Sequence, residues 1–243
     1  MSKKFKDKNV VVTGSSKGIG LEIARSFKEL GAEVLTHGSV QSNKNMDLGL
    51  KHLTANFLDN DEKIAFIKEV KKTFSKIDYL ILNAGKSIKN EDGQNSAVLR
   101  KSFEINYFSQ FDILESLTEE MSEGSAIVWI SSITGIKQIS GAPFGYSVSK
   151  NAVIYSTHLI SKDLAKKGIR INSIAPGNIL HESSVWKEKL ENEPNLVKKI
   201  LSEDVPLGRL GNPKDIVAMT LFLCGSNASF ITGQNFVVDG GQI

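Results

Sequence analysis

Short runs rich in β-branched residues alternate along this chain with segments whose apolar residues have helical spacing. In a parallel sheet the strands are buried on both faces, so they read as apolar runs, and the intervening helices cover those faces. The alternation therefore predicts an α/β fold with a single doubly wound parallel sheet and helices on both sides. The predicted strands are Asn9–Thr13, Glu33–His37, Leu53–Phe57, Tyr79–Asn83, Ala126–Ser131, Ile169–Ala175 and Asn235–Asp239.

Two segments lack this regularity. Gly38–Lys51 is polar and is predicted to form a loop rather than a full crossover helix. The segment 177–206 is long and polar and contains Trp186. A long excursion after the carboxyl end of a strand is typical of a substrate lid, which we expect over residues 178–206. The predicted helices are Ile19–Leu30, Asp61–Phe74, Ser96–Met121, Gly145–Lys167 and Asn212–Leu223.

The length of 243 residues suits one large domain, here residues 1–243, better than two. No run approaches the ~20 apolar residues of a membrane span, and the apolar run near the N-terminus is too short for a secretory signal. We therefore expect a cytoplasmic protein without membrane contact. The single cysteine, Cys224, cannot form an internal disulfide and is expected to be a small buried hydrophobe at a helix end.

Net charge is +3, with basic and acidic residues interleaved. The densest basic stretch, Lys3–Lys8, is short and terminal. We interpret it as a solvated tail ahead of the first strand and not as a nucleic-acid-binding arm. No metal site is expected.

A glycine-rich turn joins the first predicted strand to the first predicted helix, with the sequence Thr-Gly-Ser-Ser-Lys-Gly-Ile-Gly over residues 13–20. Glycines let backbone N–H groups approach a pyrophosphate, and the helix N-terminus adds partial positive charge. Strand, turn and helix in this order predict dinucleotide binding on a Rossmann-like fold. The candidate cofactor contacts here are Gly14, Ser15, Ser16, Lys17, Gly18, Ile19 and Gly20.

Tyr146 and Lys150 are four residues apart in a predicted helix and so share one face. A phenol ordinarily titrates near ~10, and a cation close by favours the phenolate. We therefore expect Lys150 to lower the pKa of Tyr146, so that the phenol exchanges a proton with an alcohol or carbonyl oxygen near neutral pH. A Tyr–Lys pair with this spacing is common on helix surfaces. It indicates an acid–base site here only in combination with the glycine turn.

Several motifs occur in a fixed order over nearly the whole chain. They are the glycine turn, Leu82–Gly85, Asn106, Ser132, the Tyr146/Lys150 pair, Pro176-Gly177 and the terminal segment 233–241. Together they resemble the classical short-chain dehydrogenase/reductase family, and the chain is similar to its 3-oxoacyl-[acyl-carrier-protein] reductases. The resemblance implies an oxidoreductase that transfers hydride between a nicotinamide cofactor and a carbonyl or secondary alcohol.

The resemblance also implies roles for single residues. Tyr146 is the expected general acid or base, and Lys150 lowers its pKa and binds the nicotinamide ribose. Ser132 polarises the substrate carbonyl, and Asn106 helps to organise a water that relays protons to Lys150. The further cofactor contacts are Asn83, Ala84 and Gly85 beside the adenosine, Asn56 and Phe57 at the adenine end, and Pro176, Gly177 and Ile179 behind the nicotinamide.

The charge at the end of the second predicted strand favours one cofactor. An acidic residue there would repel a 2′-phosphate, but this chain has Gly38 and Ser39. Lys17 can pair with the phosphate, so NADP(H) is predicted over NAD(H). Asn56 stands where many relatives have Asp. His181 stands where they usually have Thr contacting the nicotinamide carboxamide, and a contact role or a solvent-facing side chain is equally open for it.

Two other functions remain as alternatives. A non-catalytic NADP-binding sensor or scaffold would predict loss of the Asn106–Ser132–Tyr146–Lys150 set, which is intact. Sugar-nucleotide epimerases and dehydratases are generally longer and have a different glycine spacing. The expected partners are a small carbonyl or alcohol substrate and further copies of the chain, as a homotetramer or homodimer formed through helices Ser96–Met121 and Gly145–Lys167. Residues that could line the substrate pocket are Lys86, Phe144, His181 and Trp186.

Overall fold

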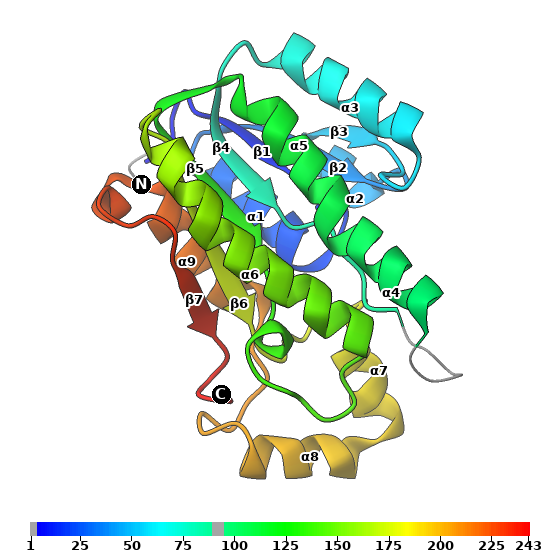
Figure 1. Cartoon of the computed structure of the whole chain (residues 1–243). Helices are drawn as coiled ribbons and strands as arrows, with labels where there is room; N and C mark the ends of the chain where they lie inside the picture. Colours follow the sequence, from blue (N-terminus) through cyan, green and yellow to red (C-terminus); the bar gives the residue numbers. More distant parts are fainter. Residues whose placement is uncertain (1–3, 89–94) are drawn as a thin grey trace.

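The computed structural model describes residues 4–88 and 95–243. Seven parallel strands form one sheet in the order β3-β2-β1-β4-β5-β6-β7 (Figure 1). The strand order reverses between β1 and β4, which is where open α/β sheets bind ligands. The predicted doubly wound fold is therefore confirmed. The strands are β1 (Asn9–Val12), β2 (Glu33–Gly38), β3 (Lys51–Thr54), β4 (Ile77–Leu82), β5 (Met121–Ile130), β6 (Arg170–Pro176) and β7 (Asn235–Val238).

Helices cover both faces of the sheet. α1 packs against α9 on one face, while α3, α4, α5 and α6 cover the other (Figure 1). α7 and α8 lie beyond the carboxyl ends of the strands, within the predicted lid. The helices are α1 (Gly18–Glu29), α2 (Asn43–Asp47), α3 (Asn60–Thr73), α4 (Ser96–Phe103), α5 (Ser109–Thr118), α6 (Phe144–Ala165), α7 (Val185–Asn192), α8 (Pro194–Glu203) and α9 (Pro213–Cys224). Shorter turns are the π-helical η1 (Glu104–Phe108) and the 3₁₀ turns η2 (Ile133–Gly135) and η3 (Ser226–Ala228).

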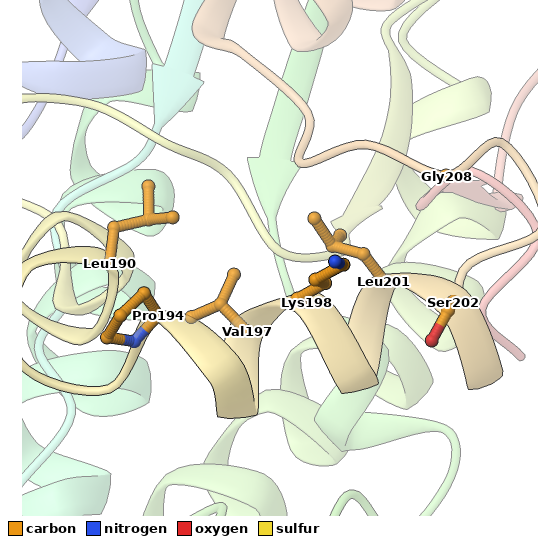
Figure 2. A pocket seen from close by; sticks show the side chains of 7 residues that line it. All are labelled: Leu190, Pro194, Val197, Lys198, Leu201, Ser202 and Gly208. Atoms are coloured by element: carbon orange, nitrogen blue, oxygen red, sulfur yellow. The ribbon is translucent and has the colours of Figure 1, made fainter.

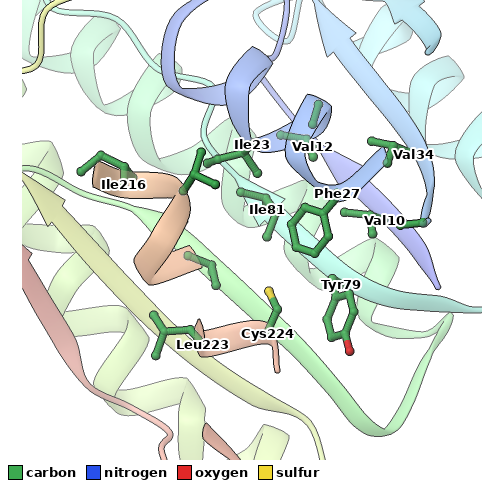
Figure 3. Packing of buried hydrophobic residues seen from close by; sticks show 14 of the residues in the cluster. Val10, Val12, Ile23, Phe27, Val34, Tyr79, Ile81, Ile216, Leu223 and Cys224 are labelled. Carbon is green, nitrogen blue, oxygen red and sulfur yellow. The ribbon is translucent and has the colours of Figure 1, made fainter. Parts of the chain in front are cut away.

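The core between the sheet and helices α1 and α9 extends to the N-terminal segment (Figure 3). Phe5 is buried there, with its ring centroid 4.9 Å from that of Phe27 and 5.5 Å from that of Tyr79. The prediction of a solvated tail is therefore wrong at Phe5, because an aromatic side chain within the basic stretch gains more from burial than from exposure. Lys3 lies outside the described residues.

Cys224 is buried at the end of α9, as predicted. Burial raises the pKa of its thiol to about 12, so the thiolate is not available near neutral pH.

The predicted helix Ser96–Met121 ends earlier and is interrupted. α4 and α5 are separated by the π-helical η1, and β5 begins at Met121, which pairs with Ile77 of β4. The wider π turn places Tyr107 on the sheet, where its ring stacks on Trp129 with centroids 5.8 Å apart. Helical periodicity in a sequence does not distinguish a π turn from an α-helix, so the predicted helix continued through the π turn.

The third predicted strand also shifts toward the N-terminus. β3 ends at Thr54 and not at Phe57, because Asn56 leaves the sheet and accepts a hydrogen bond from the Leu58 N–H at 3.2 Å. The chain turns there toward α3.

Gly38–Lys51 is not the predicted loop throughout, because it contains the short helix α2. Buried Asn45 holds this helix to the rest of the fold. Its amide nitrogen lies 3.2 Å from the Ser15 carbonyl oxygen, 3.2 Å from Thr36 Oγ1 and 2.8 Å from His52 Nδ1. These partners come from the glycine turn, β2 and β3, so the helix depends on tertiary contacts that local periodicity does not show.

We predict that Asn45→Ala lowers the free energy of unfolding by about 2 kcal/mol, because it leaves buried acceptors without a donor. Urea unfolding of the variant measures the loss. The control is Met46→Ala in the same helix, where the side chain is 63% exposed and a change within about 0.5 kcal/mol is expected. Equal losses in both variants would contradict the role given to Asn45.

Candidate active site

The predicted site residues gather at the carboxyl edge of the central strands. The glycine turn follows β1, Asn83 follows β4, Ser132 follows β5 and Gly177 follows β6. Parallel strands present their carboxyl ends at the same edge, so these four segments meet although they are far apart in the sequence.

The glycine turn approaches β4 very closely. Gly14 and Gly18 have φ values of +62° and +60°, which favour glycine. A Cβ on Gly14 would stand 2.6 Å from Ala84 Cα, so no side chain fits there. Asn83 fixes the approach, because its Nδ2 donates to the Gly14 carbonyl at 2.8 Å. Thr13 Oγ1 accepts from the N–H groups of Asn83 and Ala84 at 3.0 and 3.1 Å.

The start of α1 suits a dinucleotide pyrophosphate. Its first turn contains no acidic residue, and no side chain within the described residues caps it. The first backbone N–H groups of a helix carry partial positive charge and need acceptors. Lys17 stands exposed at the N-cap position and adds a cation. The residues present therefore fit the phosphate groups of a nicotinamide dinucleotide.

Ser15 is engaged within the turn. Its buried hydroxyl donates to the Val12 carbonyl at 2.7 Å, and the predicted cofactor contact of Ser15 stays a prediction. Ser16 is half-buried and lies against Gly38, where a Cβ would stand 3.0 Å from the Ser16 Oγ. Ser39, the next residue, is exposed.

His37 is a site residue that the sequence analysis missed. Its Nδ1 accepts from the Gly14 N–H at 3.1 Å, and its Nε2 lies 2.9 Å from the Ala55 carbonyl oxygen. The ring stacks on Phe57 with centroids 3.7 Å apart. Burial lowers its pKa to about 4, so the imidazole is neutral near pH 7 and can accept from Gly14. The sequence signal for this residue was a histidine at the end of an apolar strand, directly before the polar segment that begins at Gly38.

Lys150 and Tyr146 lie together at the start of α6. Lys150 is 3% exposed. Its Nζ donates to the Ile130 carbonyl at 2.8 Å, and the same atom lies 5.7 Å from the centroid of the Tyr146 ring. Burial lowers the Lys150 pKa to about 8.

The expected lowering of the Tyr146 pKa is not found in this structure. Burial raises the pKa of the phenol, and the Ser132 hydroxyl offsets the rise only in part. The Lys150 ammonium lies over the Tyr146 ring and donates its hydrogen bond to the Ile130 carbonyl, so it does little to stabilise the phenolate form of Tyr146. The Ser132 hydroxyl is itself buried and accepts from Thr134 Oγ1 at 3.1 Å.

Asn106 is fully buried in the π turn and fixes the segment beside Lys150. Its Oδ1 accepts from the Lys86 N–H at 2.7 Å, and its Nδ2 donates to the carbonyls of Lys86 and Ser102 at 3.0 and 2.9 Å. A Cβ on Gly85 would stand 2.8 Å from Asn106 Oδ1 and 3.2 Å from Lys150 Nζ. The Asn106 side-chain amide therefore positions the backbone at Gly85 and Lys86 beside the Lys150 ammonium.

The end of β6, where the nicotinamide is predicted to bind, is built from closely packed backbone. Gly177 lies so close to β7 that a Cβ would stand 2.7 Å from Asp239 Cα. Ile179 is buried and forms a bridge with Gly211. Two residues further on, the His181 ring lies against Gly18 of the phosphate turn, where a Cβ would stand 2.9 Å from its Nε2.

Helices α7 and α8 enclose an apolar hollow of about 390 Å³ (Figure 2). Neither Ser132, Tyr146 nor Lys150 lines it, so it lies apart from the candidate catalytic residues. Its lining residues are Leu190, Pro194, Val197, Lys198, Leu201, Ser202 and Gly208.

Within residues 4–88 and 95–243, no three His, Cys, Asp or Glu side chains come together as metal ligands. None of the helices there is long and apolar enough to cross a membrane.

Comparison with known proteins gives the family. The family described as enoyl-(acyl carrier protein) reductase matches residues 14–242. The chain belongs to this family of short-chain dehydrogenases/reductases, whose members are oxidoreductases acting on alcohol and carbonyl groups.

Individual relatives match over nearly their whole length. The 2-dehydro-3-deoxy-D-gluconate 5-dehydrogenase of Pseudoalteromonas atlantica is 33% identical, over 96% of this chain and 95% of the relative. The L-rhamnose 1-dehydrogenase (NADP(+)) of Thermoplasma acidophilum is 31% identical, over 98% and 97%. The 3-oxoacyl-[acyl-carrier-protein] reductase of Chlamydia trachomatis is 30% identical over 100% of both chains. The predicted resemblance to that class of reductase is confirmed.

A solved structure shows the same fold. The L-sorbose reductase of Gluconobacter frateurii, complexed with NADPH and L-sorbose, superposes with a TM-score of 0.88 and 24% identity, covering 100% of this chain and 99% of that one.

We predict that Lys150→Met stabilises the protein at pH 7, by up to about 3 kcal/mol. The folded pKa of about 8 lies below the ordinary 10.5, so the buried ammonium costs free energy wherever it stays protonated. Between those two pH values the unfolded chain binds more protons, so wild-type stability rises with pH relative to the variant.

Urea unfolding of both proteins from pH 7 to 10.5 measures this difference. Lys162→Met, at an exposed position of the same helix, serves as the control and should change the free energy of unfolding by less than about 0.5 kcal/mol. A wild-type-minus-variant difference that stays constant over this range would contradict the desolvation of Lys150.

Proposed function

We propose that this protein transfers hydride between NADP(H) and a carbonyl or secondary alcohol, with Tyr146 as the general acid or base. The observation that carries the proposal is the buried Lys150 ammonium beside the Tyr146 ring, at the sheet edge where the glycine turn begins α1. A buried cation costs free energy and is kept where it has a function.

In the reducing direction, a nicotinamide cofactor held at this edge would supply the hydride for the carbonyl carbon. Ser132 donates a hydrogen bond to the carbonyl oxygen and holds it beside the phenol. Tyr146 gives its proton to that oxygen, which yields the alcohol. Because burial raises the Tyr146 pKa, the phenol carries this proton at neutral pH.

Lys150 supports the reaction by binding the nicotinamide ribose from its buried position. In this structure its ammonium does little to stabilise the tyrosinate, because its hydrogen bond goes to the Ile130 carbonyl. Asn106 positions this cation through the segment at Gly85 and Lys86.

The region around Gly38 supports NADP(H) as the preferred cofactor. Ser39 is exposed and uncharged, and Lys17 is exposed at the start of α1, so a 2′-phosphate meets a cation and no carboxylate at these positions. The adenine lies toward Asn56 and Phe57, and the nicotinamide toward Pro176, Gly177 and Ile179. The L-rhamnose dehydrogenase relative carries NADP(+) in its name, which also supports this choice.

Residues 178–206 form the proposed substrate lid, since they contain α7 and α8 beyond the carboxyl edge. The names of the three relatives described above point to two substrate classes, sugar derivatives and acyl-carrier-protein thioesters. Both classes therefore belong in the substrate panel.

We also propose a cytoplasmic homotetramer or homodimer. Exposed apolar side chains follow α6 and the neighbouring η1, on the face where α4, α5 and α6 lie side by side (Figure 1). Tyr155 is 63%, Leu159 51% and Phe108 48% exposed. Apolar area of this kind on a helical face suits an isologous interface between two copies.

We predict that Tyr146→Phe lowers kcat by a factor of about 10² or more, with the NADPH dissociation constant changed less than about threefold, because only the transferable proton is lost. NADPH oxidation by purified protein against 3-oxoacyl thioesters, keto sugars and sugar acids measures turnover. The matched control is Tyr155→Phe, at an exposed position of the same helix, which should keep full activity. Undiminished turnover in Tyr146→Phe would disprove the mechanism, and tight NADPH binding without turnover of any carbonyl would favour the sensor or scaffold.

We predict that Ser39→Asp weakens NADPH binding at least tenfold and leaves NADH binding within about threefold, because the new carboxylate repels the 2′-phosphate. Fluorescence titration with both cofactors measures the two constants. Ser39→Asn is the uncharged control of similar size and should bind both as the wild type does. A wild type that binds NADH more tightly than NADPH would show that NADP(H) is the wrong cofactor.

A further inference from the structure

The segment that follows β6 crosses from the nicotinamide side of the site to the phosphate turn. We call residues 179–184 the crossing segment. Its start is fixed by backbone hydrogen bonds, since the Leu180 N–H donates to the Gly211 carbonyl at 2.8 Å and the Gly211 N–H donates to the Asn178 carbonyl at 2.9 Å. Its end is fixed by Ser184, which caps α7.

His181 is the residue of this segment that reaches the phosphate turn. A Cβ on Gly18 would stand 2.9 Å from both Cε1 and Nε2 of His181 and 3.1 Å from Nδ1. The imidazole therefore lies flat against the glycine that precedes the first N–H groups of α1. Any larger residue at position 18 would displace it.

Hydrogen bonding within the segment fixes the tautomer and the direction of the ring. Nδ1 accepts from the Ser183 N–H at 3.3 Å, so in the neutral ring the proton is on Nε2. The His181 N–H donates to Ser184 Oγ at 3.1 Å, and Ser184 Oγ donates to the His181 carbonyl at 2.8 Å. Within the described residues no acceptor lies within hydrogen-bonding distance of Nε2, so this donor is available over the turn.

The charges around His181 favour an anion at this place. Lys17 at the start of α1 is close enough to lower the His181 pKa, after the larger effect of burial, while Glu182 acts in the opposite direction. Glu182 is itself drawn toward α2 by an ion pair with Lys44. A phosphate between Lys17, the imidazole and the helix N-terminus would meet three donors at once.

We propose that His181 binds the pyrophosphate of the cofactor, with its Nε2–H donating to a phosphate oxygen beside the α1 N-terminus. The proposal rests on the proposed function, because it takes a nicotinamide dinucleotide as the ligand. It assigns His181 to the phosphates and not to the nicotinamide carboxamide, where relatives place a threonine. The crossing segment would then contact the cofactor phosphates through His181.

The test separates these two contacts by the choice of ligand. NADPH or NADH, whichever the wild type prefers, contains both groups. ADP-ribose, with the 2′-phosphate if NADPH is preferred, keeps the pyrophosphate and lacks the nicotinamide. Adenosine, or 2′-AMP for NADPH, has no 5′-phosphate and so lacks the whole pyrophosphate. Dissociation constants of all three are measured by calorimetry for wild type, His181→Ala, Glu182→Gln and His158→Ala.

We expect His181→Ala to weaken binding of the cofactor and of ADP-ribose by the same factor of about ten, because one charge-assisted hydrogen bond is lost. Binding of adenosine or 2′-AMP should be unchanged, because neither has a 5′-phosphate. Glu182→Gln breaks the ion pair with Lys44 and His158→Ala removes an exposed histidine of α6, so each should change binding by less than about twofold. His181→Gln, which keeps an N–H donor, should recover part of the loss.

Other outcomes overturn the proposal. If His181→Ala weakens the cofactor but not ADP-ribose, the contact is to the nicotinamide. If it weakens adenosine or 2′-AMP equally, the variant has disturbed the adenosine end, and thermal unfolding will show whether the fold has changed. A wild type that binds neither NADPH nor NADH overturns the proposed function as well, and this is seen before any variant is compared.

Discussion

The close approach of the glycine turn to the end of β4 is the contact on which the rest of the site depends. Gly14 lies so near Ala84 that even a methyl group is excluded, and Asn83 and Thr13 hold the two backbones together. This contact places the α1 N-terminus next to the segment at Gly85, which in turn lies against Asn106 and Lys150. The phosphate side and the acid–base side of the site are therefore one packed unit, and a shift of β1 against β4 would separate them.

Burial shifts the pKa values of the side chains in this unit and also lowers the stability of the fold. His37 is neutral and Lys150 has a lowered pKa for the same reason, namely that each is held away from water. For His37 the result is an acceptor that fixes the Gly14 N–H. For Lys150 it is an ammonium with one backbone acceptor, ready to bind further oxygens. Sites that keep unsatisfied charge in this way trade stability for function.

Much of the fold could be predicted because its signals are local. The buried parallel strands are apolar runs, and α6 falls within two residues of its predicted bounds. The elements that were missed depend on distant partners: α2 on the contacts of Asn45, and the π turn on the stacking of Tyr107 over Trp129. Within the site, spacing showed which side chains meet, as for Tyr146 and Lys150. It did not show that burial, and not the neighbouring charge, would dominate the Tyr146 pKa.

The crossing segment joins the end of β6 to the phosphate turn and to α7. Its start is tied to Gly211 through backbone hydrogen bonds, its middle lies on Gly18, and its end begins α7 of the proposed lid. A displacement of α7 would therefore act on the imidazole over the phosphate turn, because the residues between them are held at both ends. With His181 on the cofactor phosphates and residues 178–206 as the substrate lid, as proposed, movement of the lid and retention of the cofactor would be linked. Changes in the lid sequence would alter cofactor affinity as well as substrate choice.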